Sequence, residues 1–346
     1  MKVLITGGAG FIGSHLAARF LQDGCSVTVL DDLSTGSLEN ISSLHQHPQF
    51  TFHTGTVLRK EAVADLVDAS DIVYHLAAAV GVRLIVEHPV DTIRTNVVGT
   101  DVVLQAAARR KKRVVVASTS EVYGKSVEVP FREDADISIG PTTKGRWSYA
   151  CAKALDEFLA LAYWEENAVP VTVVRFFNIV GPRQVGRYGM VLPSFVGQAL
   201  RNEPITVFGS GDQTRCFAYV LEAVECLVRI ADARNVVGEV INVGNDQEVS
   251  IKELARVVNE ICESSAGVIH VSYDRAYGRG FEDMQRRVPC LQKLERLLGY
   301  RPRMPLDQIV RLVANDVKRT LKPAAWTPAF AENGLAENLD GKPVRL

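Results

Sequence analysis

The chain has 346 residues, of which 47% are hydrophobic and 23% are charged, and its formal net charge is −1. This composition predicts a globular protein with one large or two modest hydrophobic cores. A net charge so close to zero gives no electrostatic reason to expect nucleic acid or an anionic membrane as a partner.

The first predicted elements are a strand at residues 2–6 and a helix at residues 11–22, with a glycine turn between them. The glycines are Gly7, Gly10 and Gly13. Such a turn gathers backbone N–H groups at a helix N-terminus, where a diphosphate can sit. A glycine triplet alone could be an ordinary strand-to-helix turn, but the strand before it and the helix after it favour a dinucleotide site.

The second predicted strand, residues 26–30, ends at two acids, Asp31 and Asp32. They follow the glycine turn by about twenty residues, where a carboxylate can accept hydrogen bonds from a ribose diol. Because an acid at this place repels a 2′-phosphate, the sequence favours NAD over NADP.

Short apolar runs and helical stretches then alternate up to residue 176. Strands are predicted at residues 50–53, 72–75, 113–118 and 171–176, and helices at 61–66, 90–109 and 149–166. This alternation predicts a Rossmann-type, doubly wound parallel sheet in an α/β fold, with residues 1–176 as the NAD-binding domain. The basic run at residues 109–113 is expected to be a solvated helix end that leads into a strand.

The pattern is less regular after residue 176. Helices are predicted at residues 192–201, 221–232, 251–263 and 305–321, with loops and short strands between them. We expect residues 177–321 to form a smaller α/β lobe that binds the substrate, with some later segments returning to the first domain. Residues 322–346 lack periodicity and are expected to be a surface or mobile tail.

The cysteines indicate the redox environment. Six of them are scattered without a Cys-x-x-Cys pair or metal-ligand spacing, so they are expected to be reduced thiols and no metal site is predicted. No apolar run reaches membrane-spanning length, and no signal peptide precedes the first strand. We therefore expect a cytoplasmic protein.

The helix at residues 149–166 begins with Tyr149 and carries Lys153 one turn later. This spacing puts the phenol and the ammonium on one face of the helix. A nearby cation stabilises a phenolate and so lowers the pKa of a tyrosine from its usual value of about 10. Such a tyrosine can take a proton from a sugar hydroxyl while hydride leaves for NAD. Such a pair is common on exposed helix faces. It indicates a catalytic role here because a predicted nucleotide-binding half precedes it.

Hydroxyl side chains follow the predicted strand at residues 113–118, at the edge of the sheet where ligands bind. Ser118, Thr119 and Ser120 can bond a substrate oxygen and assist the tyrosine, and Glu121 can move a second proton or orient a water. The alternative for Glu121 is that it caps a helix or pairs with a lysine.

Together these motifs resemble the extended short-chain dehydrogenase/reductase family, and more narrowly its NAD-dependent nucleotide-sugar epimerases, dehydratases and decarboxylases. The resemblance covers residues 1–320. It implies a tightly bound, recycled NAD and a homodimer formed through the helices at 90–109 and 149–166. The cofactor contacts that it implies are Gly7, Gly10, Phe11, Ile12, Gly13, Asp31, Asp32, Leu76, Ala77, Ala78, Asn96, Tyr149, Lys153 and Phe177.

Later motifs of the same family imply the substrate contacts. Residues 175–183 resemble its RxFNxxGPR segment, residues 204–220 its GxGxQxRxFxYV segment, and Arg286-Arg287 its late arginine motif. A bidentate grip on phosphate is a physical reason for arginine at such places, although each arginine alone could be a surface salt bridge. The implied substrate contacts are Arg83, Asn178, Arg183, Arg215 and Arg287.

Two segments resemble those of UDP-glucuronate decarboxylases, which make UDP-xylose. They are Thr119-Ser120-Glu121 and residues 140–147, before the tyrosine. Oxidation of glucuronate at C4 makes a β-keto acid, which loses CO2 readily. Arg83 suits an acidic sugar, but a similar loop occurs in UDP-glucuronate 4-epimerases. The alternatives are therefore a UDP-glucose or UDP-glucuronate 4-epimerase, then a 4,6-dehydratase or an inactive NAD-binding homologue. Gly55-Thr56 and Leu221-Glu222 depart from the family pattern.

Overall fold

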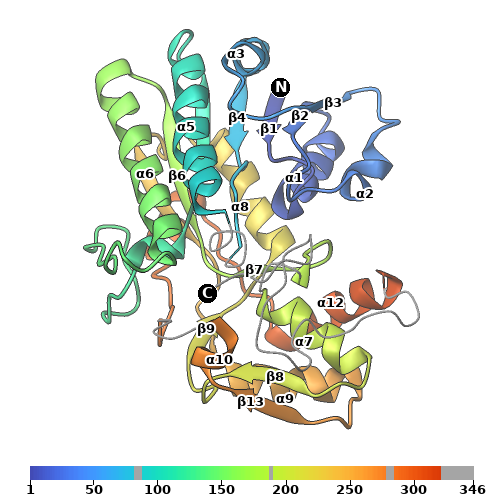
Figure 1. Cartoon of the computed structure of the whole chain (residues 1–346). Coiled ribbons are helices and arrows are strands. Elements are labelled where there is room, and N and C mark those ends of the chain that lie inside the picture. The colour runs from blue at the N-terminus through green and yellow to red at the C-terminus, as the bar shows by residue number, and fades with distance from the viewer. Residues whose placement is uncertain (82–87, 187–189, 278–283, 321–346) are drawn as a thin grey trace.

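The computed structural model describes residues 1–81, 88–186, 190–277 and 284–320 (Figure 1). Arg83, predicted to contact the substrate, and the predicted tail at residues 322–346 lie outside these described residues. No helix within the described ranges is long and apolar enough to cross a membrane.

A seven-stranded sheet with only parallel pairs takes six strands from residues 1–176 and one from later in the chain, which confirms the predicted Rossmann-type α/β fold. Its connections run outward in both directions from the pair β1·β4. The strand order across the sheet is β3 (Phe50–Thr54), β2 (Ser26–Asp31), β1 (Lys2–Thr6), β4 (Ile72–His75), β5 (Arg113–Thr119), β6 (Val171–Phe176) and β11 (Glu239–Val243).

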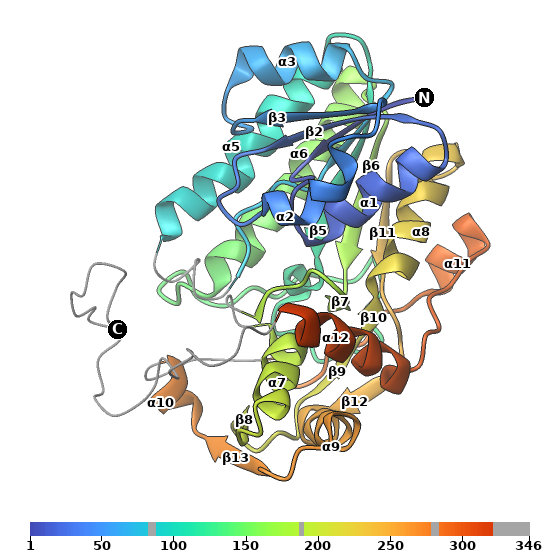
Figure 2. The ribbon, with the colours of Figure 1, turned by 90° about the vertical axis from the view of Figure 1, so that its right-hand side faces the viewer.

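Helices cover both faces of this sheet. One face packs on α1 (Phe11–Gln22) and α8 (Val220–Asp232), and the other on α3 (Lys60–Asp68), α5 (Pro89–Ala108) and α6 (Trp147–Asn167) (Figures 1 and 2). Successive side chains of a strand point to opposite faces, so Val3 and Ile5 enter the first core and Leu4 the second. This explains why a central strand such as β4 is buried along its whole length rather than at alternate residues.

The smaller part of the molecule, built mainly from residues after 176, lies beyond one end of the sheet strands, as both views show (Figures 1 and 2). Its helices α7 (Val191–Leu200), α9 (Ile251–Cys262) and α12 (Leu306–Thr320) pack on one another. Three strand pairs accompany them: β7 (Ile179–Val180) with β10 (Ala218–Tyr219), β9 (Thr214–Cys216) with β12 (Glu248–Ser250), and β8 (Ile205–Phe208) with β13 (Val268–Val271). Short helices complete the order: α2 (Leu38–Ile41), η1 (Ser42–Leu44), η2 (Ser120–Tyr123), α10 (Tyr273–Tyr277) and α11 (Gln292–Leu298).

A buried ion pair fixes α6 against the sheet. The guanidinium of Arg175 on β6 donates to both carboxylate oxygens of Glu157 on α6, with Nη2 2.7 Å from Oε2. The hydroxyl of Ser118 on β5 donates to the same carboxylate. The helix that carries Tyr149 and Lys153 is therefore tied to the carboxyl ends of two neighbouring strands.

Candidate active site

Two glycines at the turn between β1 and α1 have no room for a side chain. Gly7 has φ +72°, and a Cβ on it would lie 2.7 Å from the backbone nitrogen of Ala77. A Cβ on Gly13 would meet the carbonyl of Gly7. Gly10 caps α1 without a side-chain bond, so the first N–H groups of the helix are available to an anion. The cradle fits a dinucleotide diphosphate.

The acid at the end of β2 also holds this turn. The N–H groups of Ala9 and Leu33 donate to the two carboxylate oxygens of Asp31, at 2.9 and 2.8 Å. Burial raises the pKa of Asp31, and these backbone donors oppose the rise. The neighbouring Asp32 is exposed and accepts a bond from the N–H of Ser34. This structural role of Asp31 was not predicted.

The chain after β4 lies beside the glycine turn. A Cβ on Gly7 would contact Leu76 as well as Ala77, and the N–H of Ala77 donates to the hydroxyl of Thr6 at 3.3 Å. Asn96 on α5 is buried and fastens the next part of this loop, because its Oδ1 accepts from the N–H of Ala79 at 2.9 Å. Ala78 lies between these two anchors.

Tyr149 and Lys153 are both buried on one face of α6, as predicted. The direction of the pKa effect on the tyrosine is opposite to the prediction. Burial raises the pKa of Tyr149, and the carboxylates of Glu121 and Asp156 raise it further. Nζ of Lys153 itself lies 2.6 Å from Oδ2 of Asp156. Asp156 was not predicted; its spacing of seven residues from Tyr149 was the available signal.

The residues after β5 divide between structure and site. The hydroxyl of Thr119 caps η2 by accepting the N–H of Glu121 at 3.3 Å, and Ser120 is buried. Ser118 does not face the ligand edge as predicted, since its hydroxyl donates to the buried Glu157. The side chain of Glu121 is 20% exposed, and its Oε1 lies 3.8 Å from Nη1 of Arg287.

Arg287 reaches Glu121 because a short backbone pairing holds its segment. The N–H of Phe131 donates to the carbonyl of Val288, and the N–H of Cys290 to the carbonyl of Phe131, both at 2.8 Å. The ring of Phe131 in turn stacks on Tyr123, with ring centroids 4.6 Å apart. The predicted diphosphate arginine is thus placed beside the acid at the end of β5.

Two other predicted substrate residues lie on neighbouring segments. The amide of Asn178 donates to the carbonyl of Cys216 at 2.9 Å, which puts it next to β9. Arg215, on β9, is buried and donates to the carbonyl of Met284 at 2.9 Å. These contacts bring the segments around residues 178, 215 and 284 together.

The structure places two further predicted residues elsewhere. Phe177 is fully buried, and its ring packs against both Tyr123 and Phe131, with centroids 5.9 and 6.5 Å apart, so its side chain supports the wall of the site. Its contact with a cofactor stays a prediction. The backbone N–H of Arg183 donates to Asp316 on α12 at 2.9 Å, and burial lowers the pKa of its guanidinium. Within the described part of the chain, Arg183 makes no hydrogen bond or ion pair with Glu121 or Tyr149.

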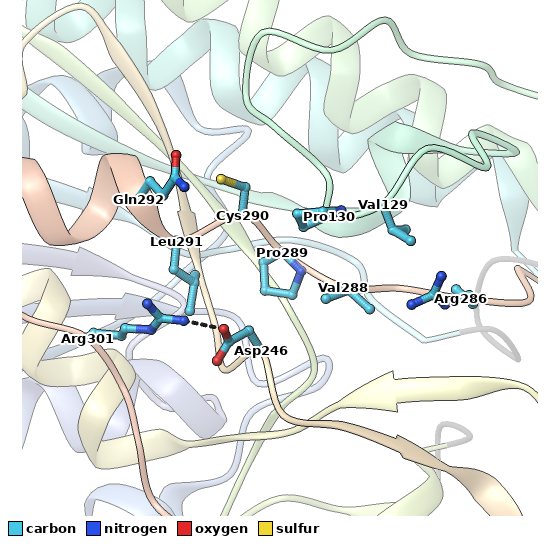
Figure 3. Close-up of a pocket in the computed structure, with 10 residues that line it drawn as sticks. All are labelled: Val129, Pro130, Asp246, Arg286, Val288, Pro289, Cys290, Leu291, Gln292 and Arg301. Atoms are coloured by element: carbon cyan, nitrogen blue, oxygen red, sulfur yellow. Dashed lines mark hydrogen bonds and ion pairs between the residues drawn. The ribbon is translucent and has the colours of Figure 1, made fainter.

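A pocket of about 270 Å³ lies outside this constellation (Figure 3). An ion pair between Asp246 and Arg301 closes one side of it, and Arg286 lies at the other. Arg286 is held by Glu248, with Nη2 2.7 Å from Oε2, while the adjacent Arg287 faces Glu121. None of the predicted catalytic residues lines this pocket.

The parallel sheet, the glycine cradle and the tyrosine and lysine at its edge define a dinucleotide-dependent enzyme of the short-chain dehydrogenase/reductase class. The sequence model of the family described as GDP-mannose 4,6 dehydratase matches residues 4–313. The chain belongs to the extended short-chain dehydrogenase/reductase family of nucleotide-sugar epimerases and dehydratases, and it is an enzyme of the NAD-dependent decarboxylase and epimerase group within it.

Two curated relatives are decarboxylases. The chain is 42% identical over 312 residues to a UDP-N-acetyl-alpha-D-glucosaminuronate decarboxylase of Bacillus cytotoxicus, a match that covers 89% of this chain and 94% of the relative. It is 36% identical over 307 residues to UDP-glucuronic acid decarboxylase 1 of Xenopus tropicalis, covering 89% and 70%.

Solved structures agree on the fold. The UDP-glucuronic acid 4-epimerase of Bacillus cereus, in complex with UDP-glucuronic acid and NAD, has a TM-score of 0.84 and 28% identity, covering 93% of this chain and all of that one. The epimerase Mth375 of Methanothermobacter thermautotrophicus has a TM-score of 0.84 and 30% identity, covering 92% of each chain.

Proposed function

We propose that the protein uses NAD to remove CO2 from a UDP-linked hexuronic acid through a 4-keto sugar, and that UDP-glucuronate, giving UDP-xylose, is its substrate. The relatives that are UDP-glucuronic acid decarboxylases support the reaction. The relative at 42% identity acts, by its name, on a 2-acetamido sugar, so UDP-N-acetylglucosaminuronate is the competing substrate.

NAD supplies the hydride acceptor and donor, and the same molecule is reused because the 4-keto sugar must be reduced again. The glycine cradle, the acids after β2, and Tyr149 with Lys153 would hold it. In this proposal residues 1–176, with β11 added, bind the dinucleotide, and residues 177–321 mainly bind the nucleotide sugar.

Tyr149 is the proposed base for the C4 hydroxyl. Its phenol lies on the face of α6 that carries Lys153, and it is close enough to Glu121 for the carboxylate to affect its pKa. The phenol takes the hydroxyl proton as hydride leaves C4, and the hydroxyl of Thr119 can bond the same sugar oxygen.

The contact between Glu121 and Arg287 carries the proposal of decarboxylation. An arginine with a side chain only 9% exposed offers a bidentate site for the sugar carboxylate. When the C5–C6 bond breaks, CO2 leaves and its electron pair moves toward the C4 oxygen, giving an enolate that hydrogen bonds from Tyr149 and Thr119 stabilise. Glu121, or a water that it orients, then delivers a proton to C5.

The remaining proposed contacts serve the diphosphate and nucleotide. Asn178 and Arg215 lie on segments joined by the bond from Asn178 to the carbonyl of Cys216. Arg183 follows β7, and its guanidinium remains a proposed phosphate contact. The proposed contact of Arg83 with the sugar carboxylate lies outside the described residues.

A homodimer is also proposed. The helices α5 and α6 pack side by side (Figure 1). Both carry exposed apolar side chains. Val90 on α5 is 74% exposed and Phe158 on α6 is 65% exposed, and Ile93 and Leu155 lie near them in the sequence. Covering these side chains with the same helices of a second copy would remove them from water.

A product assay tests the proposal. The purified protein is incubated with UDP-glucuronate or UDP-N-acetylglucosaminuronate, and the product is followed by NMR together with CO2 release. UDP-xylose with CO2 supports the proposal, and CO2 from only the second substrate moves the assignment to the 2-acetamido sugar. UDP-galacturonate without CO2 would establish the 4-epimerase alternative.

A further inference from the structure

Asp156 is a buried carboxylate on the face of α6 that carries Tyr149 and Lys153. The three residues are spaced by four and by three, so they form one row along the helix. Nζ of Lys153 lies 2.6 Å from Oδ2 of Asp156, and their side chains are 3% and 0% exposed. An ion pair so far from solvent is not screened by salt and has a fixed geometry.

A chain of buried polar groups supports this pair from the sheet. The hydroxyl of Thr100 on α5 bonds Asp156, and it lies 3.1 Å from Nε2 of His75 on β4. Nδ1 of His75 lies 2.8 Å from the hydroxyl of Thr6 on β1, next to the glycine turn. The position of the Lys153 ammonium is therefore determined by protein groups on four elements.

Few charged groups face the pair within the described ranges. His75 is neutral at physiological pH, because burial and then Lys153 lower its pKa to about 3. Glu157, the next residue on α6, raises the pKa of Asp156, while Lys153 and Thr100 oppose the stronger effect of burial.

Tyr149 is faced by two carboxylates. Glu121 on η2 and Asp156 on α6 both act on it, and Glu121 is itself paired with Arg287. Asp156 is therefore the carboxylate that couples directly to the Lys153 ammonium.

We propose that Asp156 is a positioning residue for oxidation at the sugar: it holds the ammonium of Lys153 in place and offsets part of its charge, which limits how strongly Lys153 acts on Tyr149. This inference rests on the proposed role of Tyr149 as the base. Asp156 itself touches neither cofactor nor sugar in this proposal.

The variant Asp156→Asn tests it, because the amide oxygen still accepts a bond from Lys153 but carries no charge. The readout is the ultraviolet absorbance of the Tyr149 phenolate against pH, in the NAD-loaded protein without any sugar nucleotide. The signal is the difference from the Tyr149→Phe variant. Removing a nearby negative charge stabilises phenolate, so the midpoint should fall by about one pH unit. The wild-type midpoint can lie above the pH range in which the protein stays folded. A phenolate titration that is then seen only in Asp156→Asn also supports the proposal.

Two further variants serve as controls. Asp101→Asn on α5 also removes a carboxylate between α5 and α6, where Oδ1 accepts from the hydroxyl of Tyr163 at 3.0 Å, and it should leave the midpoint unchanged. Asp156→Glu retains the charge and should keep the midpoint close to that of the wild type.

An unchanged midpoint in Asp156→Asn, with unchanged NAD affinity, would overturn the inference. If that variant does not fold, Asp156→Ser replaces it with the same expected shift; failure of both to fold would make Asp156 a purely structural residue and overturn the inference as well. The titration needs no sugar nucleotide, so its result is independent of whether CO2 is released in the product assay.

Discussion

Nη1 of Arg287 lies 3.8 Å from Oε1 of Glu121, although the two residues come from opposite halves of the chain. The backbone pairing of Phe131 with Val288 and Cys290 creates this contact. It places a buried cation beside an acid that in turn faces Tyr149. The proposed function assigns this arginine to the sugar carboxylate, whereas the sequence resemblance implied a contact with the diphosphate.

Arg287→Gln separates these two roles. If Arg287 binds the sugar carboxylate, the variant should lose about 10- to 100-fold in affinity for UDP-glucuronate, because a charged hydrogen-bonding partner is removed. Affinity for UDP-xylose, which has no carboxylate, should change little. Calorimetric titration of both ligands measures this. The adjacent Arg286→Gln, whose arginine pairs with Glu248, is the matched control. Equal losses of affinity for both ligands would show that Arg287 binds the diphosphate and not the sugar carboxylate.

Tyr149→Phe should reduce CO2 release by about 10²- to 10⁴-fold, because the variant has no group to accept the C4 proton. Binding of UDP-glucuronate should stay near that of the wild type. Single-turnover kinetics and calorimetry measure the two quantities. Tyr163→Phe on the same helix, which loses the hydroxyl bonds to Asp101 and Gln105, should keep full activity. A Tyr149→Phe variant that turns over at the normal rate would refute the assignment of the base.

Gly13→Ala should weaken NAD binding by about 10- to 100-fold, since the new methyl group must displace the Gly7 carbonyl of the cradle. Fluorescence titration with NAD measures the loss. Gly145→Ala adds the same methyl group where nothing lies within 4 Å and should have no effect on NAD affinity. Unchanged affinity in Gly13→Ala would place the dinucleotide elsewhere.

Glu157→Gln should destabilise the fold by about 3–5 kcal/mol, because it leaves Arg175 as a buried charge without its partner. Urea unfolding measures the change. Asp134→Asn breaks the exposed pair with Arg132 and should leave the free energy of unfolding nearly unchanged, because solvent screens such a pair. Equal small costs in the two variants would show that the buried pair does not hold α6 on the sheet.

The neutral His75 predicts a pH dependence of stability. Its pKa is lowered to about 3 in the folded protein, whereas in the unfolded chain it takes a proton near about 6.5. The unfolded state therefore binds more protons between these values, and this contribution to stability is lost as the pH falls. Between pH 7 and pH 5 the wild type should lose about 2 kcal/mol more than His75→Gln. If the free energy of unfolding falls equally in the two proteins between pH 7 and pH 5, His75 is not a buried neutral imidazole.

Much of the fold could be predicted because its elements have strong local patterns. The strand predicted at residues 2–6 and the helix at 11–22 match β1 and α1. By contrast, β11 was missed, since it joins the sheet edge next to β6 only through a connection from the smaller part. Local periodicity carries no information about such a pairing.

Long-range contacts explain the other differences. Arg113, expected in a solvated helix end, is half-buried and donates to the last carbonyls of α8, with Nη1 2.7 Å from the oxygen of Ala231. Glu222, at a position that departs from the family pattern, accepts the N–H of Arg303 at 2.7 Å before α12. Both side chains close gaps between segments that are distant in the chain.

The order of residues by itself determined the Rossmann-type sheet, the glycine cradle and the row that begins with Tyr149 and Lys153, because each depends on spacings within one turn or one element. Only the tertiary structure decided that Asp156 pairs with the ammonium of Lys153, that the hydroxyl of Ser118 bonds the buried Glu157, and that Arg287 lies beside Glu121. The physical reason is that burial and the pairing of charges depend on which surfaces pack together, and those surfaces come from distant parts of the chain.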